Sequence, residues 1–126
     1  MNETNQTPPQ LPPQMQYTPP PPAEDPADLV PISGIAAAIG DYDSPELHLK
    51  DTLEAGVGLC DEDAVRVLVE EGPARVEELE KLGTKFDRRD GKLILASEGA
   101  HSVPRVVRAG GDATGSVVAS ALAQAI

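Results

Sequence analysis

The feature that most limits what this chain can fold into is the uneven distribution of proline. Most of its 13 prolines lie within residues 1–28, where they alternate with Gln, Thr and Asn. Beyond Met1, that stretch offers only Leu11, Met15 and Tyr17 as large apolar side chains. It cannot bury enough apolar surface to offset the entropy of ordering the chain. We therefore predict a disordered, partly polyproline-II tail over residues 1–28 and a folded part over residues 29–126.

The folded part is poor in large side chains. The whole chain has no Trp, two Tyr and one Phe, so its core must consist of Leu, Val, Ile and Ala around Phe86. A domain of this size buries roughly 60–65% of the surface that its unfolded chain exposes, which makes it marginally stable by itself. This favours a partial domain whose remaining core lies on sequence that is absent here.

The charge pattern excludes several classes of partner. The net charge is −11, and every Lys and Arg lies at Lys50 or later without forming a dense basic patch, which argues against nucleic acid. No apolar run approaches the ~20 residues that span a bilayer, and the amino terminus lacks the pattern of a secretory signal. The single cysteine, Cys60, excludes an intramolecular disulfide. A reduced, cytoplasmic setting fits these features.

Local signals predict two helical regions in the first half of the folded part. Val30–Gly40 is small and apolar and fits either a buried strand or a short helix. Ser44 is a good N-cap before Pro45, which predicts a helix over Pro45–Ala55. Apolar residues recur with a 3.6-residue period over Glu62–Leu82, after the N-cap Asp61. Because Pro73 interrupts this stripe, we expect two helices or one sharply kinked helix, with Gly83 just beyond its end.

The second half predicts short strands and a last helix. Residues 85–87 and 92–95 are expected to pair as a hairpin around Arg89, Asp90 and Gly91. Residues 105–108 fit a short strand. Residues 116–126 fit a helix with inward side chains, namely Val117, Val118, Ala121 and Leu122. The predicted fold class is α/β, more narrowly an α+β fragment of helices plus a small hairpin.

Most single polar residues have an ordinary structural interpretation. Cys60 fits a buried structural cysteine, and one Cys with two His at these spacings does not make a metal site. His48 is expected on a solvated helical face. The glutamates around Arg75 are expected to form a charged outer face with i,i+4 pairs such as Glu77 to Lys81.

Two loops carry residues that suit chemistry. The GGDATG run, residues 110–115, places backbone N–H groups at a predicted helix start, which suits an anion or the edge of a cofactor, or simply a tight turn. Neither the dinucleotide fingerprint GxGxxG nor a phosphate-binding P-loop is present. In the EGAHS run, Glu98 and His101 stand three residues apart in a loop, where functional residues often lie.

Taken together, these runs resemble the FAD-dependent L-aspartate oxidase family. From about Ser33 onward the motifs GIAA, DSPELHLKDTL, AGVGLCDEDAV, EEGP, FDR, EGAHS and GGDATG keep that family's order and spacing. The wider family includes the flavoprotein subunits of succinate dehydrogenase and fumarate reductase. The LCDEDAV and EGAHS runs favour the aspartate oxidase branch.

The resemblance implies a reaction and a set of residues. The family oxidises L-aspartate to iminoaspartate in de novo NAD biosynthesis (the quinolinate pathway), with a hydride passing to FAD and with fumarate or oxygen reoxidising the flavin. It implies that Glu98 orients the substrate, with His101 beside it. It also implies that the cofactor lies near Ser33, Gly34, Asp112, Thr114 and Gly115.

The sequence also departs from the family pattern. Residues Pro31 to Gly34 replace the family's AQGG, Ala96-Ser97 replaces a Thr-Arg pair, and Arg108 replaces a His. The GxGxxG unit and the catalytic arginine are absent. We therefore predict a fragment that is inactive and binds no FAD by itself, with the missing remainder of the flavoprotein as its partner. The alternatives are a fragment of the succinate dehydrogenase/fumarate reductase type, or a proline-rich interaction module built on residues 18–22.

Overall fold

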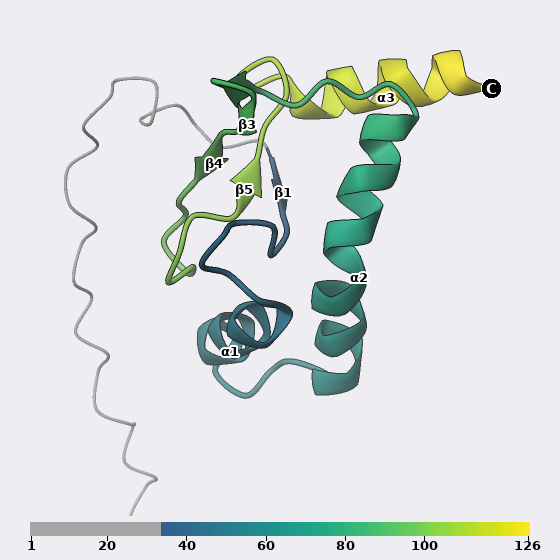
Figure 1. Ribbon diagram of the computed structural model, residues 1–126. Helices are drawn as coiled ribbons and strands as arrows, with labels where there is room; N and C mark the ends of the chain where they lie inside the picture. Colours follow the sequence, from purple (N-terminus) through teal and green to yellow (C-terminus); the bar gives the residue numbers. More distant parts are fainter. Residues whose placement is uncertain (1–33) are drawn as a thin grey trace, which may run out of the picture.

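The computed structural model describes residues 34–126 and shows an α+β arrangement (Figure 1). The predicted tail, residues 1–28, lies outside the described residues. The elements in chain order are β1 (Ile35–Ala36), α1 (Pro45–Gly56), α2 (Glu62–Lys81), β2 (Arg88–Arg89), β3 (Lys92–Leu93), β4 (Leu95–Ala96), β5 (Val106–Val107) and α3 (Thr114–Ala125). The predicted fold class is confirmed. No helix within residues 34–126 has the length and apolar character needed to cross a membrane.

A small antiparallel sheet pairs β1, at the start of the described residues, with a strand much later in the chain. Its strand order is β1-β5-β4, so β5 is central. Val107 lies opposite Ile35 on one side and Leu95 on the other. Of the two interpretations left open for Val30–Gly40, the strand is correct for its described part. The sheet therefore places Gly34, just before β1, beside the segment that leads into α3.

Helix α1 begins where its cap signal indicates. The Ser44 Oγ accepts a hydrogen bond from the Leu47 N–H at 3.1 Å, which satisfies one of the free amides of the first turn. The helix ends one residue later than predicted, at Gly56. Val57 then adopts a left-handed conformation with φ of 49°.

Helix α2 is one continuous helix, so of the two alternatives predicted for Glu62–Leu82 the pair of separate helices is wrong and a single helix that contains Pro73 is correct (Figure 1). Asp61 caps it, accepting from the Ala64 N–H at 3.1 Å. Pro73 lies inside it and removes one hydrogen-bond donor. Val69 and Val76, on either side of Pro73, are both buried. This packing holds both halves of the helix against the core, and tertiary contact outweighs the local break. Gly83 follows the helix with a φ of +107°, as predicted.

The hairpin has the predicted turn but a shifted strand. Asp90 and Gly91 have φ of 52° and 78°, which fits a two-residue type I′ turn. Arg88–Arg89, rather than residues 85–87, pairs with Lys92–Leu93. Phe86 is buried in the core, and the Asp87 N–H donates to the Arg108 carbonyl at 2.7 Å. Residues 85–87 therefore join the body of the molecule, which the prediction missed.

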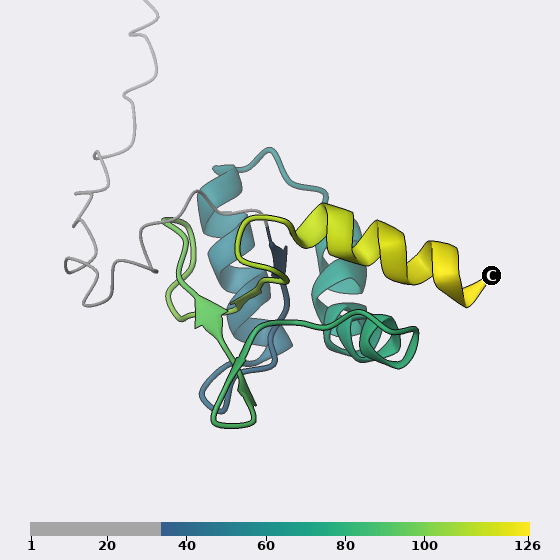
Figure 2. The ribbon, with the colours of Figure 1, turned by 90° about the horizontal axis from the view of Figure 1, so that it is seen from above.

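The core lies where α2, the sheet and the start of α3 meet (Figure 2). Its buried members are Ala37, Val76, Phe86, Val107 and Ala109. Helix α3 begins two residues earlier than predicted and runs past the end of α2 (Figure 2). Val117 packs against the core and Ala121 is buried, whereas Leu122 is 39% exposed and is not part of the core.

Candidate functional site

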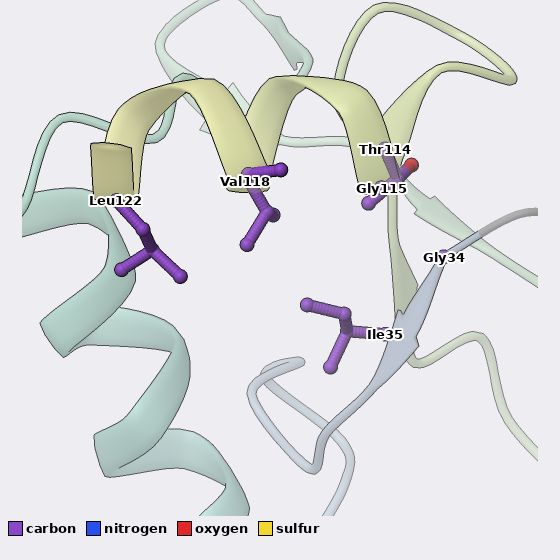
Figure 3. Close-up of a pocket in the computed structure, with 7 residues that line it drawn as sticks. Gly34, Ile35, Thr114, Gly115, Val118 and Leu122 are labelled. Carbon is purple, nitrogen blue, oxygen red and sulfur yellow. The ribbon is translucent and has the colours of Figure 1, made fainter. Parts of the chain in front are cut away.

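One open pocket is lined by residues from the start of the described chain and by residues of α3. It has a volume of about 530 Å³ and lies between β1 and α3. Figure 3 shows Val118 and Leu122 pointing from α3 toward the space beside Ile35. Its lining residues are Gly34, Ile35, Thr114, Gly115, Val118, Ala119 and Leu122. Three residues expected near the cofactor, Gly34, Thr114 and Gly115, thus share one pocket. Asp112 does not line it, and Ser33 lies outside the described residues.

Gly34 is required by the fold itself. A Cβ at this position would clash with Val106 Cγ1 and lie 2.7 Å from the Val107 carbonyl oxygen. Glycine therefore lets β1 approach the central strand β5. The close approach alone accounts for a glycine here, whatever binds in the pocket.

The glycine-rich turn before α3 is held by a side chain of the same molecule. The N–H groups of Gly110 and Gly111 both donate to the Asp87 carboxylate at 2.9 Å. The Thr114 Oγ1 accepts from the Ala109 N–H at 3.1 Å and fixes the start of the helix. For Gly110 and Gly111 the tight-turn interpretation fits, because an anion there would have to displace Asp87.

The walls of the pocket suit the apolar part of a flavin ring. These walls are the aliphatic side chains of Ile35, Val118 and Leu122. Gly115 also lines the pocket and carries no side chain that would fill it. The dimethylbenzene end of a flavin ring is flat and apolar and packs well on such a surface, whereas its pyrimidine end carries polar groups that need hydrogen-bond partners. None of the described residues that line it is Lys or Arg. The described residues therefore fit one part of FAD.

The loop that carries Glu98 connects β4 to β5, whereas the glycine-rich turn follows β5. The Glu98 carbonyl accepts from the His101 N–H at 3.0 Å. The Glu98 Oε2 lies 3.8 Å from the His101 Nε2. The structure thus brings the two predicted residues together. The loop borders a second open pocket of about 430 Å³, lined by Asp51, Glu54, Ala55, Gly99, Ala100, His101 and Ser102.

A buried ion cluster, which we define as Arg105, Asp43 and Asp51, supports this loop. The Arg105 side chain is 0% exposed, and those of Asp43 and Asp51 are 1% and 6% exposed. Arg105 donates through Nε and Nη2 to the two oxygens of Asp43, at 2.9 and 2.8 Å. Its Nη1 donates to Asp51 Oδ2 at 2.9 Å. This bidentate geometry is the strong form of an arginine–carboxylate pair.

The surroundings of Asp51 and Arg105 favour the charged form of each of these two groups. Burial by itself raises the pKa of Asp51, but hydrogen bonds from Ser102 and Arg105 outweigh it, so the pKa lies below its usual value. Burial by itself lowers the pKa of Arg105, and the two aspartates more than reverse this. The buried Asp51 and Arg105 therefore stay charged in the interior.

The sequence reasoning missed this cluster, placing Arg105 only at the start of a strand. The available signal was an arginine directly before the apolar pair Val106–Val107, which was predicted to lie in a strand. A charge in such a strand must find carboxylate partners to be buried. Which aspartates supply them depends on how α1 docks, and local sequence does not specify that.

The prediction of a solvated His48 is wrong. His48 is 5% exposed, and its ring meets that of His101 edge-on with centroids 5.5 Å apart. Burial, followed by the positive charge of Arg105, lowers the pKa of His48. Within the described part of the chain its Nδ1 has no hydrogen-bond partner. The face of α1 that carries His48 and Asp51 turns toward the loop of residues 97–104, which the helical pattern did not reveal.

Two other residue predictions have mixed outcomes. The outer face of α2 is charged as expected, but Arg75 pairs with Glu78 at 2.7 Å and with Glu71 at 3.8 Å. The Glu77–Lys81 pair is not among the ion pairs formed within residues 34–126. Cys60 is half-buried, with its Sγ 3.6 Å from the Thr52 carbonyl, which fits a structural role.

Comparison with known proteins agrees with this arrangement. The sequence model of the FAD binding domain matches residues 30–126. The L-aspartate oxidase of Streptomyces coelicolor is 53% identical over 94 residues, which cover 74% of this chain and 16% of that protein. That of Mesorhizobium japonicum is 59% identical over 83 residues, covering 65% and 16%. The Escherichia coli quinol fumarate reductase FrdA has a TM-score of 0.69 and 33% identity, covering 74% and 16%.

These matches separate the branches of the family. The chain spans about 16% of the length of the curated relatives named above. Its identity to the L-aspartate oxidases exceeds its identity to the fumarate reductase, so the alternative of a succinate dehydrogenase or fumarate reductase fragment is not favoured. The resemblance to L-aspartate oxidase stated from the motifs is confirmed. The chain belongs to the FAD binding domain family and corresponds to one part of an L-aspartate oxidase-type flavoprotein.

Proposed function

We propose that this chain supplies the ring-side wall of the flavin site and the substrate loop of an L-aspartate oxidase. The reaction is the oxidation of L-aspartate to iminoaspartate in NAD biosynthesis, with fumarate or oxygen as the final acceptor. FAD supplies the hydride acceptor when it is bound. The observation that carries the proposal is the meeting of Gly34 with Thr114 and Gly115 at one apolar pocket, although they lie far apart in the sequence. A cytoplasmic setting belongs to the same proposal.

Within the site, the aliphatic wall and the loop have separate roles. Ile35, Val118 and Leu122 pack against the ring and exclude water from it. Glu98 accepts a hydrogen bond from the amino group of L-aspartate through its half-buried carboxylate. A charge-assisted bond of this kind fixes the direction of the substrate as well as binding it. His101 lies beside Glu98 in the loop and helps to shape the site.

The isolated chain lacks the means to hold the whole cofactor. Pyrophosphate binding in dinucleotide folds uses a GxGxxG turn that feeds the start of a helix. The sequence contains no GxGxxG, and the N–H groups of Gly110 and Gly111 before α3 already donate to Asp87. We therefore expect the remainder of a flavoprotein to be the partner that completes the site. The visible spectrum of the purified chain tests this expectation. A colourless protein is expected, whereas a yellow protein with stoichiometric FAD would contradict it.

A chimera tests the proposed flavin wall. Residues 34–126 would replace the matching segment of the Streptomyces coelicolor L-aspartate oxidase, and Val118→Asp would be introduced into the chimera. Setting a carboxylate against an apolar ring costs at least about 1.4 kcal/mol, a tenfold loss of FAD affinity. The control is Val67→Asp on the exposed face of α2, which is expected to leave FAD content unchanged. Equal FAD affinity in both variants would refute the proposed wall.

A further inference from the structure

The geometry around His101 determines which ring nitrogen carries its proton. The Arg105 Nη1 lies 3.1 Å from His101 Nδ1. A guanidinium has five N–H donors and no acceptor, and it stays charged at any pH a protein tolerates. The His101 Nδ1 must therefore be the acceptor of this hydrogen bond. In the neutral imidazole the proton then resides on Nε2.

The protonated nitrogen faces Glu98. His101 Nε2 lies 3.8 Å from Glu98 Oε2, and the His101 side chain is 13% exposed. At this separation the N–H dipole and the carboxylate attract one another although they do not form a short hydrogen bond. The His101 backbone N–H also donates to the Glu98 carbonyl at 3.0 Å. Glu98 is thus held through its main chain and attracted through its side chain by the same residue.

Arg105 can impose this arrangement because it is itself immobile. Both oxygens of Asp43 hold its Nε and Nη2, and Asp51 holds its Nη1. The same Asp51 Oδ2 accepts from the N–H and the Oγ of Ser102, both at 2.8 Å. The residue that follows His101 is therefore anchored on the same carboxylate oxygen as the arginine. The loop has little freedom to rotate the ring away.

We infer that Arg105 selects the Nε2–H tautomer of His101, and that His101 thereby positions the carboxylate of Glu98. The other ring that meets His101 is that of His48, edge-on at 5.5 Å. The first half of the inference stands on geometry alone. The second half rests on the proposed role of Glu98 toward the substrate. In this arrangement Arg105 and His101 are positioning residues, and Glu98 is the residue that touches L-aspartate.

Nitrogen NMR of the full 126-residue chain tests the tautomer. The chain has two histidines, so spectra of His48→Gln and His101→Asn assign both rings. Spectra are recorded at about pH 8.5, roughly two units above the ordinary histidine pKa. The expected result is at least about a tenfold excess of the Nε2–H tautomer at His101, the ratio set by one hydrogen bond from a charged donor. An Nδ1–H form, or an even mixture, would overturn the inference.

Two variants decide which neighbour sets the tautomer. Glu98→Gln is expected to leave the excess intact, because Arg105 still donates to Nδ1. Arg105→Lys is expected to lower it, because a single ammonium cannot serve Asp43, Asp51 and the ring in the same geometry. A tautomer that changes in Glu98→Gln and persists in Arg105→Lys would refute the assignment to Arg105. If Arg105→Lys does not fold, the spectra of the unaltered chain and of Glu98→Gln still decide.

The measurement that would refute the proposed function differs from the one that would refute the tautomer assignment. Loss of the tautomer excess would overturn the positioning role of His101 and Arg105. It would not bear on the proposed function, which aspartate turnover by the chimera tests. Tolerance of Glu98→Gln in an active chimera would overturn the substrate role of Glu98 without altering the tautomer. The two outcomes are independent.

Discussion

Replacing Arg105 by methionine should be among the most damaging single changes in the folded part. Arg105→Met keeps a long side chain but removes the charge between two carboxylates that are 1% and 6% exposed. Four hydrogen bonds to Asp43, Asp51 and His101 are lost. Removing one partner of a buried ion pair costs about 3–5 kcal/mol, because it leaves buried charge without compensation. Domains of this size have stabilities of roughly 5–15 kcal/mol, so the loss is a large share of the total.

Urea denaturation followed by circular dichroism measures this cost. Arg75→Met is the matched control, because Arg75 also pairs with two carboxylates but on the exposed face of α2. Exposed pairs contribute about 0–1 kcal/mol, so the control should unfold close to the unaltered chain. The deficit of Arg105→Met should also shrink as the pH falls below the ordinary aspartate pKa, because the stability that the lowered pKa of Asp51 gives the unaltered chain is then lost.

Two results would refute the reasoning. One is a loss below about 1 kcal/mol for Arg105→Met, which would mean that the cluster is solvated. The other is an equal loss for Arg75→Met and Arg105→Met, which would mean that burial does not distinguish them.

Three further changes test individual contacts. Burial lowers the folded-state pKa of His48, so its contribution to stability is fully present above about pH 6.5 and is lost as the pH falls through the folded pKa. In this pH range the urea midpoint of the unaltered chain should fall more steeply than that of His48→Gln. Parallel curves for the two proteins would contradict this. Gly34→Ala should cost about 1–3 kcal/mol because its Cβ meets Val106 and the Val107 carbonyl, whereas Gly115→Ala, with open space around it, should not destabilise the chain in the same urea experiment. Asp87→Ala leaves the N–H groups of Gly110 and Gly111 without their acceptor and should cost about 1–3 kcal/mol of unfolding free energy, measured by urea denaturation. Amide exchange at both glycines should also become faster. Unchanged exchange would show that Asp87 does not hold the turn.

The elements that the sequence predicted well are those with strong local signals. Ser44 and Asp61 each cap a helix because a side-chain oxygen three residues before an amide satisfies it without help from the rest of the fold. Asp90 and Gly91 form the predicted turn because few other residues tolerate positive φ. Their positions could therefore be read before any tertiary contact was known.

The misses share one physical cause, which is packing between segments far apart in the chain. Pro73 breaks no helix, because the buried side chains of Val69 and Val76 hold both halves in place. His48 is buried because α1 docks against a loop about fifty residues later. Arg105 finds Asp43 and Asp51 across similar separations. The proximity of Glu98 and His101 could be predicted from sequence because they are near neighbours, whereas the cluster that holds their loop could not.

The most direct test of the proposed function is aspartate turnover by the chimera with and without Glu98→Gln. If Glu98 accepts a hydrogen bond from the substrate amino group, the change should lower kcat/KM by about tenfold or more, since a bond to a charged group contributes about 1.5–3 kcal/mol. FAD content should stay the same. Glu77→Gln, on the exposed face of α2, should leave both quantities unchanged. A chimera that carries its full FAD and tolerates Glu98→Gln without loss of kcat/KM would contradict the account.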